Sequence, residues 1–213
     1  MAEYRGYWRR TWEQSGDLPD ANIGIAFSGW AAWENALQGS ANVIGSLRGD
    51  KYISLGGGNA NGRFTSSLLQ AITTAIQSGQ FAEYQGIAYD VEEGDSGLEQ
   101  VFRDSFAAAR AANFKVLVTV SHSAPYGITD ALQLMMSFFN DQNINFLSPQ
   151  LYTNGTETEN NYETTAGVLW SHYTQAQALV IPSVVTADLY SSGREYLANQ
   201  GVTTHGYIQW SRV

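Results

Sequence analysis

The sequence predicts an α/β fold built on eight parallel strands. Two patterns predict it: short runs rich in β-branched and aromatic residues, and longer segments of helical periodicity between most of them. The predicted strands are 5–8, 22–28, 51–58, 84–92, 115–123, 144–152, 179–185 and 205–210. Eight strands separated by helices is the number that closes a (β/α)8 (TIM) barrel, which we therefore predict. An open doubly wound sheet is the alternative, although it rarely needs eight evenly spaced strands.

Helices are predicted at 33–48, 62–79, 97–112, 128–141, 165–177 and 191–199. The third of them places four apolar side chains on one helical face: Val101, Phe102, Phe106 and Ala109. The segment 9–21 is too short and too loop-like for a full helix, and the sequence given stops three residues after the eighth predicted strand. We therefore expect a trimmed barrel that lacks a full first and a full last helix. The absence of a linker or repeat predicts one domain, 1–213.

Polar residues gather at the carboxyl ends of the predicted strands, where the active sites of such barrels lie. The fourth strand ends with Asp90 and Glu92, whose side chains share one face because they are two residues apart. If that face is the interior, Ile87, Tyr89 and Val91 point to the helices. Further polar residues and tryptophan stand at other strand ends: Asn59, Ser121, Ser123, Gln150, Tyr152, Gln209 and Trp210. The two carboxyls are therefore predicted to belong to a shared polar mouth.

The composition excludes several classes of protein. A net charge of −9 argues against nucleic-acid binding, which needs a basic surface. The chain has no cysteine and no run of about 18 apolar residues, so neither a thiolate metal site nor a membrane span is predicted. His122, His172 and His205 form no ligand-spaced pair, and we interpret each as structural or surface. Aromatic residues make up 13% of the chain, which suits carbohydrate binding but also an ordinary core.

Four stretches resemble signatures of family 18 glycoside hydrolases: SLGGG at 54–58, GIAYDVE at 86–92, PQLYTN at 149–154 and YIQWS at 207–211. The resemblance follows the eight strands in order and is strongest to the compact, hevamine-like chitinase/lysozyme subgroup. It implies hydrolysis of β-1,4 bonds next to N-acetylglucosamine in chitin-like saccharides, with retention and with the sugar's own acetamido group as nucleophile. An endo-β-N-acetylglucosaminidase acting on N-glycan cores is also possible. No metal or cofactor is implied.

The resemblance also implies roles for individual residues. Glu92 corresponds to the general acid, Asp90 to the carboxylate that orients the acetamido group, and Tyr152 to the tyrosine that hydrogen-bonds its oxygen. The implied substrate-binding residues are Gln150, Trp210, Tyr7, Gly57 and Asn154. Among these, Trp210 corresponds to the tryptophan beneath the reacting sugar ring.

The strand-four pattern of the family, DxxDxDxE, is incomplete, because Gln85 and Ala88 replace its first two aspartates. Without an inner partner, Asp90 is expected to stay turned toward Glu92 and to raise the pKa of that carboxyl. The presence of Glu92 favours an enzyme. The replacements favour the alternative, a non-catalytic carbohydrate-binding or inhibitor protein on the same barrel.

Strands one and eight are neighbours in a closed barrel, so both missing helices would leave one seam uncovered. Strand parity turns His205, Tyr207 and Gln209 outward there, and we expect loop or solvent to cover them. Such a seam is too polar for an obligate dimer interface, which predicts a monomer.

The implied substrates lie mostly outside cells, so we expect a secreted protein, although the first ten residues lack the apolar core of a signal peptide. The Asn154-Gly155-Thr156 glycosylation sequon directly follows Tyr152, where a glycan would obstruct the cleft. We interpret it as an unused match.

Overall fold

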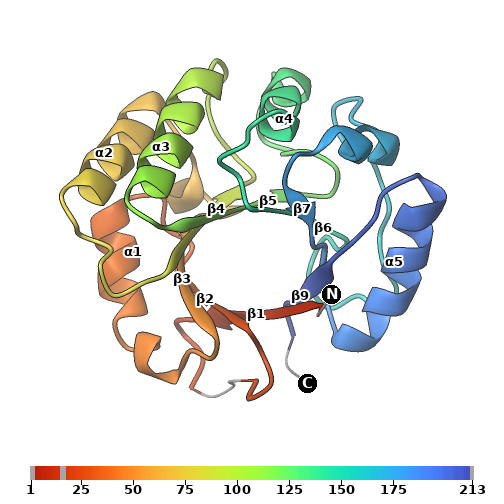
Figure 1. Ribbon diagram of the computed structural model, residues 1–213, viewed down its shortest axis with the longest axis horizontal. Coiled ribbons are helices and arrows are strands. Elements are labelled where there is room, and N and C mark those ends of the chain that lie inside the picture. Colours follow the sequence, from red (N-terminus) through yellow and green to blue (C-terminus); the bar gives the residue numbers. More distant parts are fainter. Residues whose placement is uncertain (1–2, 15–17, 212–213) are drawn as a thin grey trace.

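The computed structural model describes residues 3–14 and 18–211, and its strands close into a parallel barrel with helices outside it (Figure 1). The strands are β1 Tyr4–Arg10, β2 Ile23–Phe27, β3 Asp50–Gly56, β4 Gly86–Val91, β5 Lys115–Ser121, β6 Phe146–Gln150, β7 Leu179–Val180, β8 Ser183–Val184 and β9 Gly206–Gln209. Their order is β5-β4-β3-β2-β1-β9-β8-β6-β7, and a β5–β6 pairing closes the ring. The predicted fold class is confirmed.

The short strands β7 and β8 are two halves of one barrel strand. Val180 in β7 pairs with Leu147, and Ser183 in β8 pairs with Gln150 further along the same neighbour, β6. Pro182 lies between the halves and has no backbone N–H to donate, which interrupts the ladder. The nine strands in the described chain therefore fill the eight places of the predicted barrel.

Five α-helices are present in the described residues: α1 Trp33–Ser40, α2 Ser66–Gln77, α3 Glu99–Ala111, α4 Ala131–Phe139 and α5 Tyr190–Asn199. Short 3-10 turns occur at η1 Ile44–Ser46, η2 Ala60–Gly62, η3 Trp170–Gln175 and η4 Ala187–Leu189. The helix predicted over 165–177 is wrong, because only η3 forms there. Ala166 and Gly167 have φ angles of 55° and 75°, a left-handed turn that an α-helix cannot contain.

The predicted strand parity of β4 is confirmed. Tyr89 packs outward against α3, with its ring centroid 4.9 Å from that of Phe106. Ile87 and Val91 belong to the same outer apolar cluster, which fills the space between the sheet and the helices. Ala88 belongs instead to a smaller cluster inside the barrel. Asp90 and Glu92 therefore continue the inward face toward the mouth, as predicted.

The seam between β1 and β9 is covered partly by loop and partly by helix. Among the described residues, no helix lies between β1 and β2, and none follows β9. Arg9 is buried because its Nη1 donates to the carbonyls of Arg10 and Glu13, at 2.9 and 2.7 Å, in the loop after β1. The ring of Tyr207 in β9, however, lies 5.0 Å from that of Tyr190 at the start of α5. The expected loop covering is thus found over β1, whereas α5 covers part of β9.

No helix in the described residues combines the length and the apolar character that crossing a membrane requires.

Candidate active site

A cavity of about 590 Å³ opens at the carboxyl ends of the barrel strands. Its walls come from the ends of β2, β4, β5 and β6 and from the segments that follow β1, β3, β4, β5, β6 and β9. They are formed by Trp12, Phe27, Gly58, Asn59, Asp90, Glu92, Ser121, His122, Tyr126, Gln150, Tyr152, Thr153, Asn154 and Trp210. The fold therefore brings together six of the eight residues to which the sequence assigned a catalytic or substrate-binding role: Asp90, Glu92, Gln150, Tyr152, Asn154 and Trp210.

Asp90 lies at the bottom of this pocket and is almost completely buried. Gln150, at the end of β6, donates from Nε2 to Asp90 Oδ1 at 3.3 Å and to Thr119 Oγ1 at 3.2 Å. Burial, and then the charge of Glu92, raise the pKa of Asp90 well above its usual range, against the opposing effect of the Gln150 hydrogen bond. The Gln150 amide therefore fixes the direction of the Asp90 carboxyl.

Glu92 follows β4 by one residue and stands above Asp90. Burial, followed by the negative charge of Glu93, raises the pKa of Glu92 to about 7, while a hydrogen bond from the backbone N–H of Gly58 opposes the shift. A side chain at position 58 would bring its Cβ within 2.9 Å of Glu92 Oε2, so glycine permits this approach. We expected Asp90 to raise the pKa of Glu92, but burial and the charge of Glu93 are the effects that raise it. The result is a carboxylic acid that still holds its proton close to neutral pH.

Aromatic rings form the floor beside the two carboxyls. The ring of Trp210 lies 6.1 Å from that of Tyr152 and 5.6 Å from that of Phe27. The Arg10 guanidinium sits 4.4 Å from the centroid of Trp210, which helps to hold the indole in place. Tyr152 hydrogen-bonds to Ser183, and its burial raises the pKa of the phenol well above the usual range, so the hydroxyl stays neutral. This floor can receive the flat apolar face of a ligand.

Tyr7 and Gly57 do not line the pocket. Tyr7 points outward from β1, the opposite direction to Trp8, and its hydroxyl accepts a hydrogen bond from the backbone N–H of Arg48 at 3.0 Å. The expectation that Tyr7 lies near the two carboxyls is therefore wrong. The alternation of side chains along β1 places Tyr7 in the apolar cluster between the sheet and the helices. Gly57 lies next to the wall, with φ at 151° and its missing Cβ 3.4 Å from the Phe27 ring.

Several pocket residues were not predicted from the sequence to belong to the site: Trp12, Phe27, His122, Tyr126 and Thr153. His122, which we interpreted as structural or surface, has a φ angle of 50° and a 3.0 Å hydrogen bond between its Nε2 and Thr153 Oγ1. Non-glycine residues with positive φ are uncommon, and they concentrate at functional sites. Most of these residues lie in connecting loops, whose paths no periodicity reveals.

Glu157 anchors the loop that carries Thr153 and Asn154 to the pocket. Its carboxylate accepts backbone N–H groups of residues 153, 154, 155 and 156 at 2.6, 2.7, 2.7 and 2.9 Å. Partial burial acts to raise the pKa of Glu157, but these backbone donors lower it overall. Gly155 in the same loop packs against the edge of Trp210. A Cβ at position 155 would lie 2.3 Å from the indole Nε1, so this close approach requires glycine.

We predict that Glu157→Gln lowers the free energy of unfolding by about 1 kcal/mol, because a neutral amide accepts these hydrogen bonds less strongly. The folded-state pKa lies below the unfolded value, so the carboxylate's contribution is complete above about pH 4.3 and is lost as pH falls through the folded-state pKa. Thermal unfolding at pH 7 and at pH 3 checks both points. Glu159→Gln, an exposed neighbour with the same charge change, is the control. Equal losses in both variants would contradict the anchoring role.

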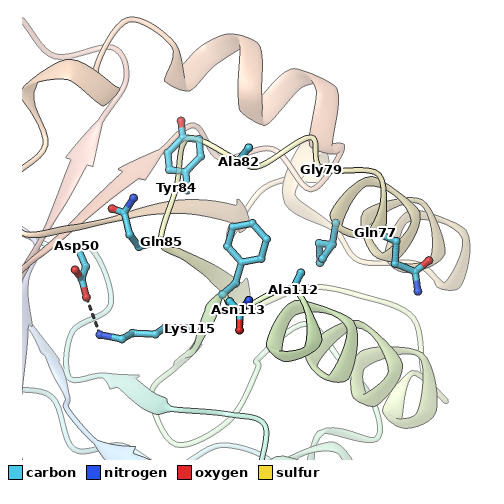
Figure 2. Close-up of a pocket in the computed structure, with 11 residues that line it drawn as sticks. Asp50, Gln77, Gly79, Ala82, Tyr84, Gln85, Ala112, Asn113 and Lys115 are labelled. Atoms are coloured by element: carbon cyan, nitrogen blue, oxygen red, sulfur yellow. Dashed lines mark hydrogen bonds and ion pairs between the residues drawn. The ribbon is translucent and has the colours of Figure 1, made fainter.

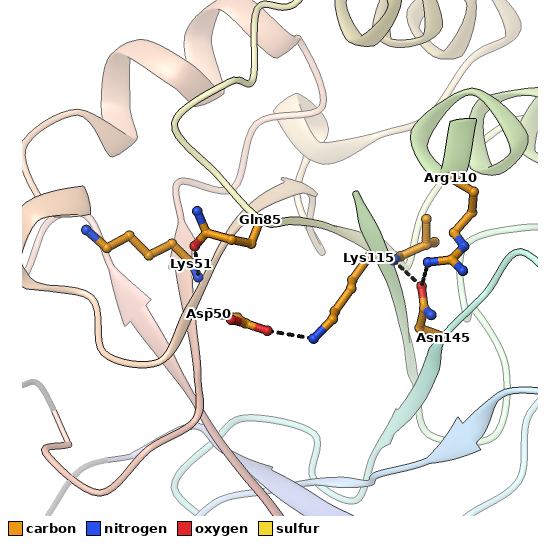
Figure 3. Close-up of polar contacts among 7 residues, drawn as sticks. Asp50, Lys51, Gln85, Arg110, Lys115 and Asn145 are labelled. Carbon is orange, nitrogen blue, oxygen red and sulfur yellow. Dashed lines mark hydrogen bonds and ion pairs between the residues drawn. The ribbon is translucent and has the colours of Figure 1, made fainter. Parts of the chain in front are cut away.

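A second cavity, of about 640 Å³, lies at the opposite end of the barrel, where β3, β4 and β5 begin (Figure 2). An ion pair of 2.7 Å between Lys115 Nζ and Asp50 Oδ2 spans the starts of β5 and β3 (Figure 3). Gln85 accepts the backbone N–H of Lys51 at 2.8 Å and so ties the entry of β4 to β3. Gln85, one of the two departures from the family pattern, is therefore a structural residue remote from the carboxyl pair.

The fold and the site define a (β/α)8 barrel with an aromatic pocket and a carboxyl pair in its mouth. No protein-family model and no curated protein matches the sequence.

Solved structures with similar barrels include an endo-β-1,4-xylanase of glycoside hydrolase family 10 from Gloeophyllum trabeum (TM-score 0.56, 10% identity, 98% of this chain and 84% of that chain). Another is the spore cortex-lytic enzyme SleL of Bacillus megaterium (TM-score 0.58, 8% identity, 99% of this chain and 70% of that chain). A third is a type I 3-dehydroquinate dehydratase from Clostridium difficile (TM-score 0.50, 10% identity, 99% of this chain and 88% of that chain). At these identities the similarity shows the fold alone.

Proposed function

We propose that this protein is a glycoside hydrolase that cleaves β-1,4 bonds next to N-acetylglucosamine in chitin-like oligosaccharides. The observation that carries the proposal is Glu92, a carboxyl whose pKa is raised to about 7 in an aromatic pocket and which stands beside Asp90. The four sequence stretches that resemble family 18 glycoside hydrolases supply the substrate class. Of the similar barrels, the xylanase is named as a glycoside hydrolase, whereas the cortex-lytic enzyme and the dehydratase are not.

In the proposed reaction, Glu92 gives its proton to the glycosidic oxygen as the bond to the sugar's anomeric carbon breaks. The carbonyl oxygen of the 2-acetamido group attacks that carbon from the other face and forms a cyclic oxazolinium ion. Asp90 accepts a hydrogen bond from the acetamido N–H. The positive charge of the oxazolinium ion favours the ionised form of Asp90, which opposes the raised pKa of this carboxyl and offsets that charge. Water then attacks the anomeric carbon and gives its proton to the Glu92 carboxylate, which restores the acid and retains the configuration.

A non-catalytic sugar-binding protein is the second candidate function. The observation that favours it is Ala88, which fills the barrel interior below Asp90 with a methyl group. Asp90 then has no carboxyl partner beneath it with which to exchange a proton between the two steps. The aromatic floor and the Gln150–Asp90 hydrogen bond would serve binding equally well.

Incubation with chitin oligomers and with a high-mannose glycopeptide, followed by mass spectrometry, tests the proposal. Shortened chitin oligomers are the expected products, while cleavage within the glycopeptide core would identify an endo-β-N-acetylglucosaminidase. Xylohexaose is the comparison substrate. Tight binding of chitin oligomers without any product would favour the second candidate.

The proposed mechanism predicts that activity falls as pH rises through about 7, because Glu92 must be protonated to act and its pKa is raised to that value. Glu93→Gln removes the neighbouring negative charge, so the pKa of Glu92 should fall and the alkaline limb should move to lower pH. Rate measurements from pH 4 to pH 9 check both statements. Glu195→Gln, an exposed change of the same charge on α5, should leave the limb in place. Equal profiles for Glu93→Gln and wild type would contradict the assignment.

A further inference from the structure

Two exposed aromatic rings flank the carboxyl pair. Four large hydrophobic side chains are strongly exposed in the described chain: Trp12 (62%), Tyr126 (54%), Leu132 (38%) and Leu169 (52%). The two aromatic ones line the active-site pocket, and the two leucines do not. Trp12 follows β1 and Tyr126 follows β5, strands separated by three others in the sheet order. The rings therefore come from opposite sides of the barrel mouth.

Tyr126 is held in place despite its exposure. Its backbone N–H donates to Ser121 Oγ at 3.0 Å, and its hydroxyl donates to Glu93 Oε1. The next residue, Gly127, donates to the carbonyl of Glu92 at 2.8 Å. A ring fixed at its backbone and at its hydroxyl loses little conformational freedom when a ligand stacks on it.

The position of Tyr126 also indicates on which side of the scissile bond its ring would contact the substrate. A Cβ placed on Gly58 would lie 2.9 Å from Glu92 Oε2 and 3.4 Å from the Tyr126 hydroxyl, so the acid and the phenol meet at this glycine. In the proposed mechanism, Glu92 protonates the oxygen that leaves with the acceptor sugar. That departing sugar is therefore next to Tyr126.

Trp12 extends the aromatic floor in the other direction. Its ring lies 5.8 Å from Phe27, and Phe27 lies 5.6 Å from Trp210. The loop that presents Trp12 is held on either side of it, because Arg10 Nε forms a 2.5 Å ion pair with Glu13. Three rings thus continue from the place of the reacting sugar toward the β1 side.

We propose that the pocket is the centre of a cleft for an internal stretch of at least three sugars, with Tyr126 as the platform for the sugar on the leaving side and Trp12 as the platform beyond the reacting ring. The inference rests on the proposed function and makes the enzyme endo-acting. Glu93 is a positioning residue that acts through Tyr126. Flat rings on both sides favour equatorially linked sugars, whose C–H faces stack on aromatic surfaces.

Binding measurements in the Glu92→Gln background separate this inference from turnover. Calorimetric titration with N-acetylglucosamine oligomers of two to six units should show affinity that rises with length. Trp12→Ala and Tyr126→Ala should each weaken binding of the hexamer about tenfold and flatten the length dependence. Leu169→Ala, a similarly exposed residue outside the pocket, should change nothing. Tyr126→Phe and Glu93→Gln release the ring from its anchor without removing it, and each should weaken binding about threefold.

The outcomes distinguish the inference from the proposed function. Affinity that is independent of length, or unaffected by both alanine variants, would overturn the inference even if the wild-type protein cleaves chitin oligomers. Chitin oligomers could instead neither bind nor react, while xylohexaose binds with the same dependence on Trp12 and Tyr126. That result would support the extended cleft and contradict the proposed substrate. Absence of binding by every oligosaccharide would overturn both.

Discussion

Glu92→Gln should abolish turnover of chitin oligomers, with a loss of at least about 100-fold, and should leave their binding intact. Glutamine has nearly the same shape as glutamic acid, and its amide has no proton that it can transfer to a glycosidic oxygen. Glu92 lies in the pocket wall beside Gly58 rather than in the apolar core, so the substitution should not disturb folding. Product formation by mass spectrometry and binding by calorimetry measure the two effects separately.

Glu195→Gln provides the matched control, because it removes one negative charge from an exposed site on α5. It should retain full activity. Full activity in Glu92→Gln would exclude Glu92 as the acid and with it the proposed mechanism. A wild-type protein that binds chitin oligomers but yields no product would show instead that the pocket serves recognition.

The barrel and the placement of the two carboxyls were predictable because both follow from strand periodicity. A strand that is covered by helices on one side and by the barrel interior on the other alternates its side chains between two environments. Tyr89 therefore packs against α3 and Asp90 lies in the barrel mouth, as the two-residue period of side chains along a strand predicts. The same rule applied to β1 would have turned Tyr7 outward once Trp8 was assigned to the interior. The resemblance to a known motif was followed there instead, and the location was wrong.

The rim of the pocket was not predictable by this means. Trp12 and Tyr126 lie on loops, where neither the period of a strand nor that of a helix constrains the side chain. Their positions depend on single hydrogen bonds and ion pairs, such as the one between Tyr126 and Glu93. The false helix at 165–177 has a related cause, because a left-handed turn at Ala166 overrides a helix-like pattern.

The interior position below Asp90 provides the second large expected effect. Ala88 is fully buried and pairs in register with Ser54 on β3 and Leu117 on β5. The hydroxyl of Ser54 is buried and has no hydrogen-bond partner. Ala88→Asp would place a carboxyl beside that hydroxyl and two residues below Asp90 on the same face. Burial among apolar side chains raises the pKa of such a carboxyl, so it should be protonated at neutral pH.

We expect Ala88→Asp to lower the free energy of unfolding by about 1–3 kcal/mol, because the new carboxyl finds only partial hydrogen bonding in this interior. Ala88→Asn should have a similar cost, since its side chain has nearly the same size and polarity. Chemical denaturation of both variants measures it. An unchanged stability would show that the interior has room for a polar group.

The two variants should differ in their pH–rate profiles. In Ala88→Asp, the new carboxyl can share a proton with Asp90 and stabilise its ionised form, and a negative Asp90 holds the proton on Glu92 to higher pH. The alkaline limb should therefore move upward in Ala88→Asp and much less in Ala88→Asn, which cannot exchange a proton. Identical profiles in an active enzyme would show that position 88 takes no part in the reaction. If the wild type is inactive and Ala88→Asp gains turnover, the missing inner carboxyl is the reason that this barrel only binds its sugar.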